Sequence, residues 1–224
     1  MDSSPTGVVA ELQKKYENSP ITDQLVRAQT TGFIAEHWRK RWPEHLAVPE
    51  VLETEEKYVR VSRQQLFDAA ETVRDEADAI ELYVKVAGWG TGPMARPAAR
   101  VVRVLDDPDA PKKLLDAFHA AREAEPVEAY ATLRYGGANR IPYFGPAFFT
   151  KWLYFSAGAP SAPGEHTPLI LDRRVSLALG WSETTGWKTA RYGEYLDLAE
   201  EIRRLWVPDL PTHVVEYGLF MLNV

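Results

Sequence analysis

The fold of this chain is decided by residues 136–155, whose sequence is GGANRIPYFGPAFFTKWLYF. The paired glycines Gly136 and Gly137 are typical of a helix end, where a left-handed backbone conformation is common. Gly145 followed by Pro146 favours a new helix, because proline fits the first helical turn. We therefore predict two helices joined by a short hairpin. Unpaired backbone N–H groups at the start of the second helix can hold one phosphate group.

The second predicted helix places a lysine beside an apolar surface. Four aromatic residues share one stripe of this helix and are interpreted as core residues: Phe144, Phe148, Trp152 and Phe155. Lys151 lies on the neighbouring stripe. Partial burial would lower the pKa of Lys151 and leave the neutral amine that a lysine nucleophile requires. The alternative is a lysine that follows the apolar surface and carries its ammonium group to water.

A second motif follows at residues 168–175, with the sequence PLILDRRV. A short apolar run ends at Asp172, directly before a helix predicted over 172–179. Aspartate is among the best N-cap residues, so capping is one explanation of its position. The apolar run and the adjacent Arg173 and Arg174 are not required for capping, but they do not exclude it.

Helical periodicity dominates the rest of the chain and predicts a mainly α fold. Residues 22–42 are predicted to form one long helix, and the stretch Gly88–Pro93 is predicted to end another helix after about Ala87. Polarity alternates over Tyr58–Val61, so at most a minor extended segment is expected near 57–61. Alternating strand and helix units are absent, which disfavours a Rossmann or P-loop protein. Residues 1–224 are expected to form a single compact helical unit or two packed lobes.

The composition excludes several classes of protein. The chain has no cysteine, which rules out disulfides, a cysteine nucleophile and iron–sulfur clusters. Its five histidines are scattered without metal-ligand spacing, so no metal and no cofactor are expected. No apolar run is long enough to span a membrane, and the start of the chain lacks a signal-peptide pattern. We expect a cytoplasmic protein without a membrane partner or an obligate protein partner.

Charge is unevenly distributed along the chain. The formal net charge of −6 by itself disfavours nucleic acid as a partner. Between Arg134 and Arg191, however, seven basic and three acidic residues give +4, which leaves −10 for the rest. An acidic body with one basic face is compatible with DNA binding, with weak affinity for nonspecific DNA.

The order of hairpin, helix, loop and helix-opening aspartate over residues 133–180 resembles the helix-hairpin-helix DNA glycosylase superfamily. Ile141–Gly145 is similar to the Leu-Pro-Gly-Val-Gly hairpin of that superfamily, and Leu169–Asp172 is similar to its Val-Pro-Val-Asp. The resemblance is closest to small bacterial 8-oxoguanine DNA glycosylase (OGG)-like proteins. It implies a helix-hairpin-helix glycosylase-like fold and, as partner, double-stranded DNA containing a modified base that is flipped out of the duplex.

The resemblance also implies roles for individual residues. Asp172 would stabilise positive charge at C1′ of the sugar and help to activate the nucleophile. The phosphate-binding hairpin would comprise Ile141, Tyr143, Gly145 and Ala147. Further DNA contacts are expected from Arg140, Arg173 and Arg174.

Two positions depart from the superfamily pattern. Tyr143 stands where the first hairpin glycine is expected, and Ala147 stands where the catalytic lysine is expected. Lys151 follows one helical turn later, a shift of about 6 Å. Either Lys151 is the nucleophile of a glycosylase with β-lyase activity, or water is the nucleophile and Asp172 acts alone.

The sequence therefore predicts a DNA glycosylase that cleaves the N-glycosidic bond of a modified base. Oxidised guanine, in base-excision repair, and a hypermodified phage base, in antiviral defence, are alternative substrates. One alternative function is a noncatalytic helix-hairpin-helix DNA-binding or scaffold protein, and another is a helical protein-interaction domain. Four aromatic residues are candidates for the base pocket, with packing as the alternative role: Trp89, Trp181, Trp187 and Tyr192.

Overall fold

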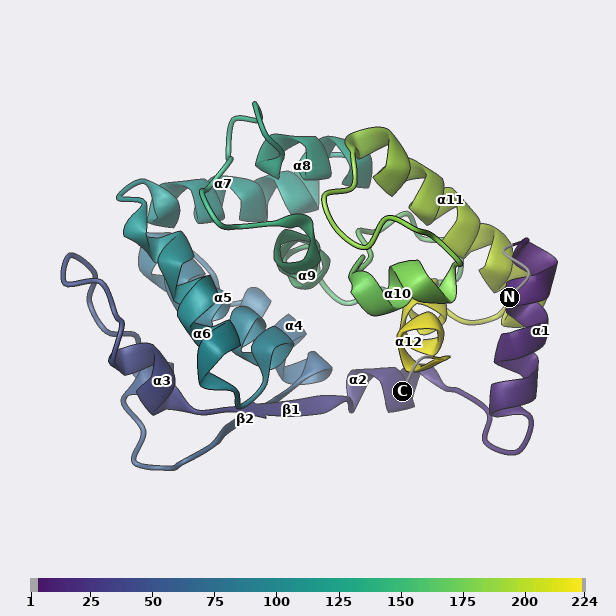
Figure 1. Cartoon of the computed structure of the whole chain (residues 1–224), viewed down its shortest axis with the longest axis horizontal. Helices are drawn as coiled ribbons and strands as arrows, with labels where there is room; N and C mark the ends of the chain where they lie inside the picture. The colour runs from purple at the N-terminus through teal and green to yellow at the C-terminus, as the bar shows by residue number, and fades with distance from the viewer. Residues whose placement is uncertain (1–3, 223–224) are drawn as a thin grey trace.

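The computed structural model describes residues 4–222, and it confirms a mainly α fold (Figure 1). The α-helices are α1 (Pro5–Tyr16), α2 (Asp23–Arg27), α3 (Ala35–Arg39), α4 (Arg63–Ala70), α5 (Glu76–Thr91), α6 (Ala95–Val102), α7 (Ala110–Glu123), α8 (Pro126–Leu133), α9 (Pro146–Ser156), α10 (Arg173–Ala178), α11 (Thr189–Trp206) and α12 (His213–Leu222). Two short 3-10 helices, η1 (Glu50–Leu52) and η2 (Arg103–Asp106), and two strands, β1 (Thr30–Phe33) and β2 (Val59–Ser62), are also present. Within these residues, no helix has the length and apolar character needed to cross a membrane.

Helix α9 occupies the centre of the molecule, where Figure 1 shows it nearly end-on. It packs against α4, α5, α7 and α8. Its residues from Phe149 to Ser156 are all buried, as expected for a helix that is apolar on nearly every side. Any polar side chain on α9 is therefore held in place by the surrounding core.

The predicted long helix over residues 22–42 is wrong. The chain instead forms α2, then β1, then α3. Strand β1 pairs antiparallel with β2, with Thr31 opposite Val61. Two adjacent threonines and Gly32 favour helix weakly, so pairing with β2 decides the local structure. The extended segment expected near 57–61 is present as β2, but its partner strand was not predicted.

The helix predicted to end at about Ala87 continues as α5 through Thr91 and ends at Gly92, inside the stretch predicted to break it. A Cβ atom at Gly88 would lie 2.5 Å from the ring of Phe33. At Gly90 it would lie 3.0 Å from Cδ of Lys151. These glycines therefore permit close approach of neighbouring side chains to α5, which explains their presence inside a helix.

A chain of buried polar side chains connects α4, α9, α12 and α2. Arg63 donates to Glu216 Oε2 at 2.6 Å and to the hydroxyl of Tyr154 at 3.2 Å. The Tyr154 hydroxyl lies 2.7 Å from Nδ1 of His213, and His213 Nε2 lies 2.6 Å from Oδ1 of Asp23. Arg63 and Glu216 are each about 1% exposed. Burial of these side chains is tolerated because their hydrogen-bonding atoms are nearly all paired with one another.

We expect the free energy of unfolding to decrease as pH falls below about 6.5, the ordinary pKa of histidine. Burial lowers the pKa of His213, and neighbouring Arg63 and Arg27 act in the same direction against the opposing effect of Asp23. The unfolded chain then binds a proton at a pH where the folded chain does not, so stability is present above this pH and lost below it. Urea unfolding at pH 7 and pH 5 measures the loss.

His213→Gln removes the titrating group and should reduce the pH-dependent loss of stability. His119→Gln, at an exposed site, is the control and should retain the wild-type pH dependence. Equal pH dependence in wild type and His213→Gln would show that His213 does not cause the loss of stability. The pKa of Asp23 is lowered from 3.8, so the stability that its ionised form contributes is lost only at pH values below the range of this experiment.

Candidate active site

One carboxylate oxygen of Asp172 caps the N-terminus of α10, and the other faces α9. Its Oδ1 accepts hydrogen bonds from the backbone N–H groups of Arg174 at 2.9 Å and Val175 at 3.2 Å. The capping interpretation is thus confirmed. Its Oδ2 lies 3.3 Å from Nζ of Lys151. Capping fixes the carboxylate but leaves an oxygen available to the site.

Lys151 reaches this carboxylate from the central helix. The residue is only 6% exposed, and its Nζ also donates to the carbonyl oxygen of Ala147 at 2.8 Å. Helical side chains lean toward the N-terminus of their helix, so the amine lies one turn before its own Cα. The Lys151 amine therefore lies beside the backbone carbonyl of Ala147, one helical turn before its own Cα.

The Asp172 carboxylate is held in its ionised form. Burial alone would raise its pKa, but the charge of Lys151 and the backbone N–H groups of Val175 and Arg174 outweigh burial and hold the pKa below its ordinary value. A fixed negative charge is therefore present at neutral pH, next to a lysine on the central helix.

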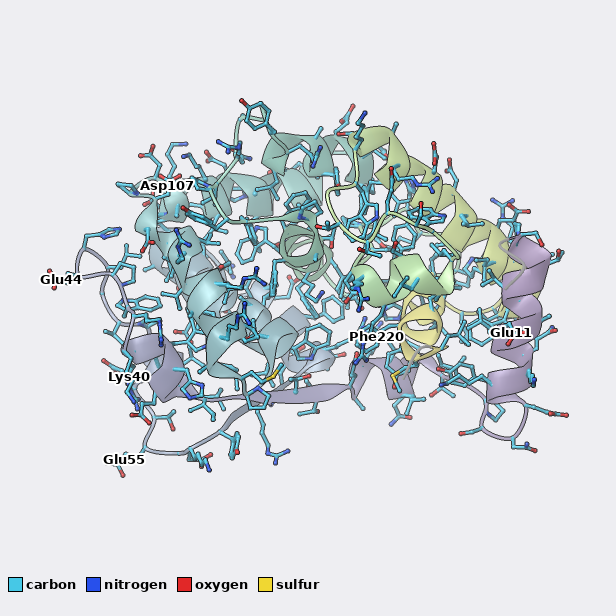
Figure 2. All side chains as sticks on the ribbon, in the orientation of Figure 1. Glu11, Lys40, Glu44, Glu55, Asp107 and Phe220 are labelled. Atoms are coloured by element: carbon cyan, nitrogen blue, oxygen red, sulfur yellow. The ribbon has the colours of Figure 1, made fainter. Side chains whose placement is uncertain are left out.

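The Lys151–Asp172 pair lies on a surface hollow of about 420 Å³. Trp89, Gly90 and Phe220 line the same hollow. Figure 2 labels Phe220, which lies on the side of α12 that faces the middle of the molecule. Phe148, predicted as a core residue, is instead partly buried at the rim, because the hollow leaves one side of it uncovered.

Below the pair, a narrower cavity of about 70 Å³ continues into the protein. Its lining combines the pair and Trp89 with Gln29, Arg63 and Glu216. Burial raises the pKa of Glu216, against the pull of Arg63. The cavity therefore combines the ring of Trp89 and the amide of Gln29 with the buried ion pair of Arg63 and Glu216.

Most of these cavity residues were not predicted from the sequence. Gln29 precedes β1, Arg63 begins α4, and Glu216 and Phe220 belong to α12, so no common motif links them. One signal was available in residues 213–222, HVVEYGLFML, where Glu216 is the single carboxylate of a largely apolar helix. A carboxylate in such a helix is seldom buried unless it has a partner.

The predicted hairpin contains a tight turn. The backbone N–H of Phe144 donates to the carbonyl of Ile141 at 3.3 Å, and Tyr143 has φ +65°. Proline at the second position and a positive φ at the third are typical of a type II turn, which favours glycine at that third position. Tyr143 thus adopts the backbone conformation of the glycine that it replaces. Its exposed ring stacks against Arg103, whose guanidinium lies 3.8 Å from the ring centroid.

The start of α9 is open to a ligand. Gly145 is the N-cap, and no side chain caps the helix there. Its φ of −86° suits any residue, and an added Cβ would meet no atom within 4 Å. Neither backbone conformation nor internal packing therefore requires glycine at this position. Glycine is also among the residues favoured at an N-cap, and here it leaves room for close approach of an external group, such as a phosphate.

The other predicted site residues are dispersed. Ile141 is buried beneath the hairpin, and Arg140 lies over the ring of Tyr135. Arg173 and Arg174 line the hollow that holds Lys151 and Asp172, and Arg174 also lies over the ring of Phe220.

Of the four aromatic candidates for a base pocket, Trp89 lines the hollow. Trp187 and Tyr192 are 1% and 0% exposed, and the hydroxyl of Tyr192 bonds to the backbone of Leu169. Trp181 is covered by Arg191, at 3.7 Å from its ring centroid. These three residues pack or stabilise loops in the structure.

The geometry agrees with a comparison to known protein families. A family model described as "Putative 8-oxoguanine DNA glycosylase OGG-like protein" matches residues 24–220. The chain therefore belongs to this OGG-like family of DNA glycosylases. No curated protein sequence and no solved structure matches the chain significantly.

Proposed function

We propose that this protein releases a modified base from DNA by chemistry at Asp172 and Lys151. The observation that carries the proposal is the 3.3 Å contact between Lys151 Nζ and Asp172 Oδ2, on a hollow that leads into a polar cavity. A base flipped from the duplex would enter between Trp89 and Phe220 and bring C1′ of its sugar to the pair. The family assignment supports this reaction class.

Asp172 supplies negative charge where positive charge develops. Cleavage of an N-glycosidic bond leaves cationic character at C1′, which a fixed carboxylate stabilises in the transition state. The lowered pKa of Asp172 supports this role, because the carboxylate remains ionised at neutral pH. Its N-cap hydrogen bonds hold it in place before the substrate arrives.

Lys151 is the proposed nucleophile. The proton that its ammonium group gives up would pass to the departing base, so that Asp172 keeps its negative charge during the reaction. The amine then forms a bond to C1′ as the bond to the base breaks, and opening of the sugar gives a Schiff base. Subsequent elimination of the 3′ phosphate is the β-lyase step. The contact of the amine with Asp172 in the lining of the hollow supports this assignment over a water nucleophile.

Oxidised guanine and a hypermodified phage base remain the two candidate substrates. The polar lining of the narrow cavity, which includes Gln29 beside the Arg63–Glu216 pair, suits the polar edge of an oxidised purine. The outer hollow of about 420 Å³ leaves room for a bulky substituent on a phage base. Repair is the corresponding role for the first substrate and antiviral defence for the second.

Borohydride trapping on duplexes carrying 8-oxoguanine, and on phage DNA with modified bases, tests the mechanism. We expect a covalent protein–DNA adduct with wild type and none with Lys151→Gln, because borohydride reduces the Schiff base. Lys85→Gln is the matched control, since Lys85 is also ion-paired, at 2.9 Å from Glu81, but lies outside the site.

Each other outcome supports a different alternative. Base release without an adduct would identify water as the nucleophile. DNA binding without release of any tested base would indicate a noncatalytic helix-hairpin-helix DNA-binding or scaffold protein. No DNA binding at low salt would indicate a protein-interaction domain.

A further inference from the structure

Helix α6 and the residue after it carry a row of three arginines that lies outside the basic segment noted in the sequence. Arg96, Arg100 and Arg103 are separated by four and three residues, a spacing that places them on one helical face. All three are exposed. Among residues 4–222, none of them pairs with a carboxylate. Asp107, labelled in Figure 2, is instead paired with Lys113 at 2.8 Å.

The α6 arginine row (Arg96, Arg100 and Arg103) borders the active-site region. Arg100 and Arg103 line a hollow of about 490 Å³, beside the hairpin. Ala147 and Phe148 line both this hollow and the hollow that holds Lys151 and Asp172. The stack of Arg103 on Tyr143 joins the row to the hairpin. A ligand that covers the start of α9 would therefore extend onto α6.

Positive charge flanks the site on two sides. Arg173 and Arg174, at the start of α10, line the hollow that holds Lys151 and Asp172. In Figure 1, α6 and α10 lie on opposite sides of α9. One row of phosphates could follow the α10 side and the start of α9, while a second row would lie toward α6. Two rows of phosphates separated by a groove are the geometry of a duplex.

We propose that the α6 arginine row binds phosphates of the DNA strand opposite the strand that carries the extruded base. This inference rests on the proposed function, which places the extruded base over Asp172. The row extends about 10 Å along the helix axis, from the 1.5 Å rise per residue. Phosphates of one strand rise about 3.4 Å each along a duplex, so three arginines match about three phosphates.

Comparison of duplex and single-stranded DNA separates this role from general attraction to DNA. Fluorescence anisotropy would measure the affinity of wild type and of Arg96→Gln/Arg100→Gln/Arg103→Gln for one unmodified sequence in both forms, over a salt series. The triple variant should bind the duplex roughly tenfold or more weakly at low salt. Its slope of log affinity against log salt should be shallower by about 3. Affinity for the single strand should change little.

Two further variants control for the loss of charge alone and for the loss of the Arg103–Tyr143 stack. Lys14→Gln/Lys40→Gln/Lys112→Gln removes the same net charge at exposed lysines of α1, α7 and the end of α3, and it should bind duplex like wild type. Arg96→Gln/Arg100→Gln preserves the Arg103–Tyr143 stack and should show about two thirds of the change in salt slope. An equal loss for duplex and single strand, or a loss matched by the lysine variant, would overturn the inference.

Base release from a single-stranded modified substrate distinguishes this inference from the proposed function. If the triple variant releases base as wild type does but loses duplex affinity, both stand. If duplex affinity is unchanged while base is released, the α6 assignment fails alone. If wild type releases no base from any substrate, the proposed function fails, and the assignment to a strand opposite an extruded base fails with it.

Discussion

Replacing Asp172 with asparagine will lower the rate of base release by about 10²- to 10⁴-fold while the protein stays folded. Asparagine caps a helix about as well as aspartate, so α10 keeps its N-terminal hydrogen bonds. What the variant loses is the negative charge that faces Lys151 at 3.3 Å. Single-turnover base release from the active substrate, with circular dichroism as a check of folding, measures the effect.

Asp75→Asn is the matched control for this substitution. Asp75 caps α5 through the same pattern of two backbone N–H groups, from Ala77 and Asp78, and is exposed. Asp75→Asn should therefore release base at the wild-type rate. If both variants keep near-wild-type rates, Asp172 is a cap alone and the proposed mechanism is wrong.

The ionisation of Asp172 also sets an expectation for pH. Its pKa is lowered from 3.8, so the carboxylate keeps its charge throughout the neutral and mildly acidic range. Protonation of Asp172 therefore cannot account for any loss of base release between pH 7 and pH 5. Such a loss would arise from another group or from reduced stability, as expected from His213.

Glu216→Ala should destabilise the protein by about 3–5 kcal/mol, because it leaves the buried guanidinium of Arg63 without its carboxylate partner. For a chain of this size, that corresponds to a fall in Tm of roughly 6–20 °C. Urea and thermal unfolding measure the change. Stability is the correct measure here, because Glu216 also lines the candidate base cavity.

The double variant Arg63→Met/Glu216→Leu separates loss of packing from an unpaired charge. Replacing both partners with apolar residues removes the desolvation cost of each, so the double variant should be more stable than Glu216→Ala. A double variant that is less stable than Glu216→Ala would show that Arg63 is stabilised mainly by its other contacts, with Gln29 and Tyr154. A loss below about 1 kcal/mol for Glu216→Ala would contradict the prediction itself.

Local patterns were sufficient to locate the hairpin, α9, α10 and the pair of candidate catalytic side chains. Helix periodicity, the start signal at Gly145-Pro146 and the N-cap at Asp172 depend on neighbours within one or two turns. They could therefore be predicted from sequence. Lys151 was predicted from its place on the rim of an apolar stripe, which depends on the same short-range geometry.

Local patterns failed where distant segments pack together. Strand β1 forms because β2 is available to pair with it, across residues 30–62. Helix α5 continues through Gly88 and Gly90 because Phe33 and Lys151 fill the space beside them. In both cases long-range contacts outweigh weak local preferences.

Short-range patterns in the sequence therefore predict a mainly α protein with a hairpin before α9 and an aspartate at the start of α10. Packing of the start of α10 against α9 is what brings the amine of Lys151 to Asp172, 21 residues later in the chain. Only the tertiary structure assembles the cavity from Gln29, Arg63 and Glu216. The physical reason is that capping and periodicity act over a few residues, whereas a site is formed by segments that meet only when the core is packed.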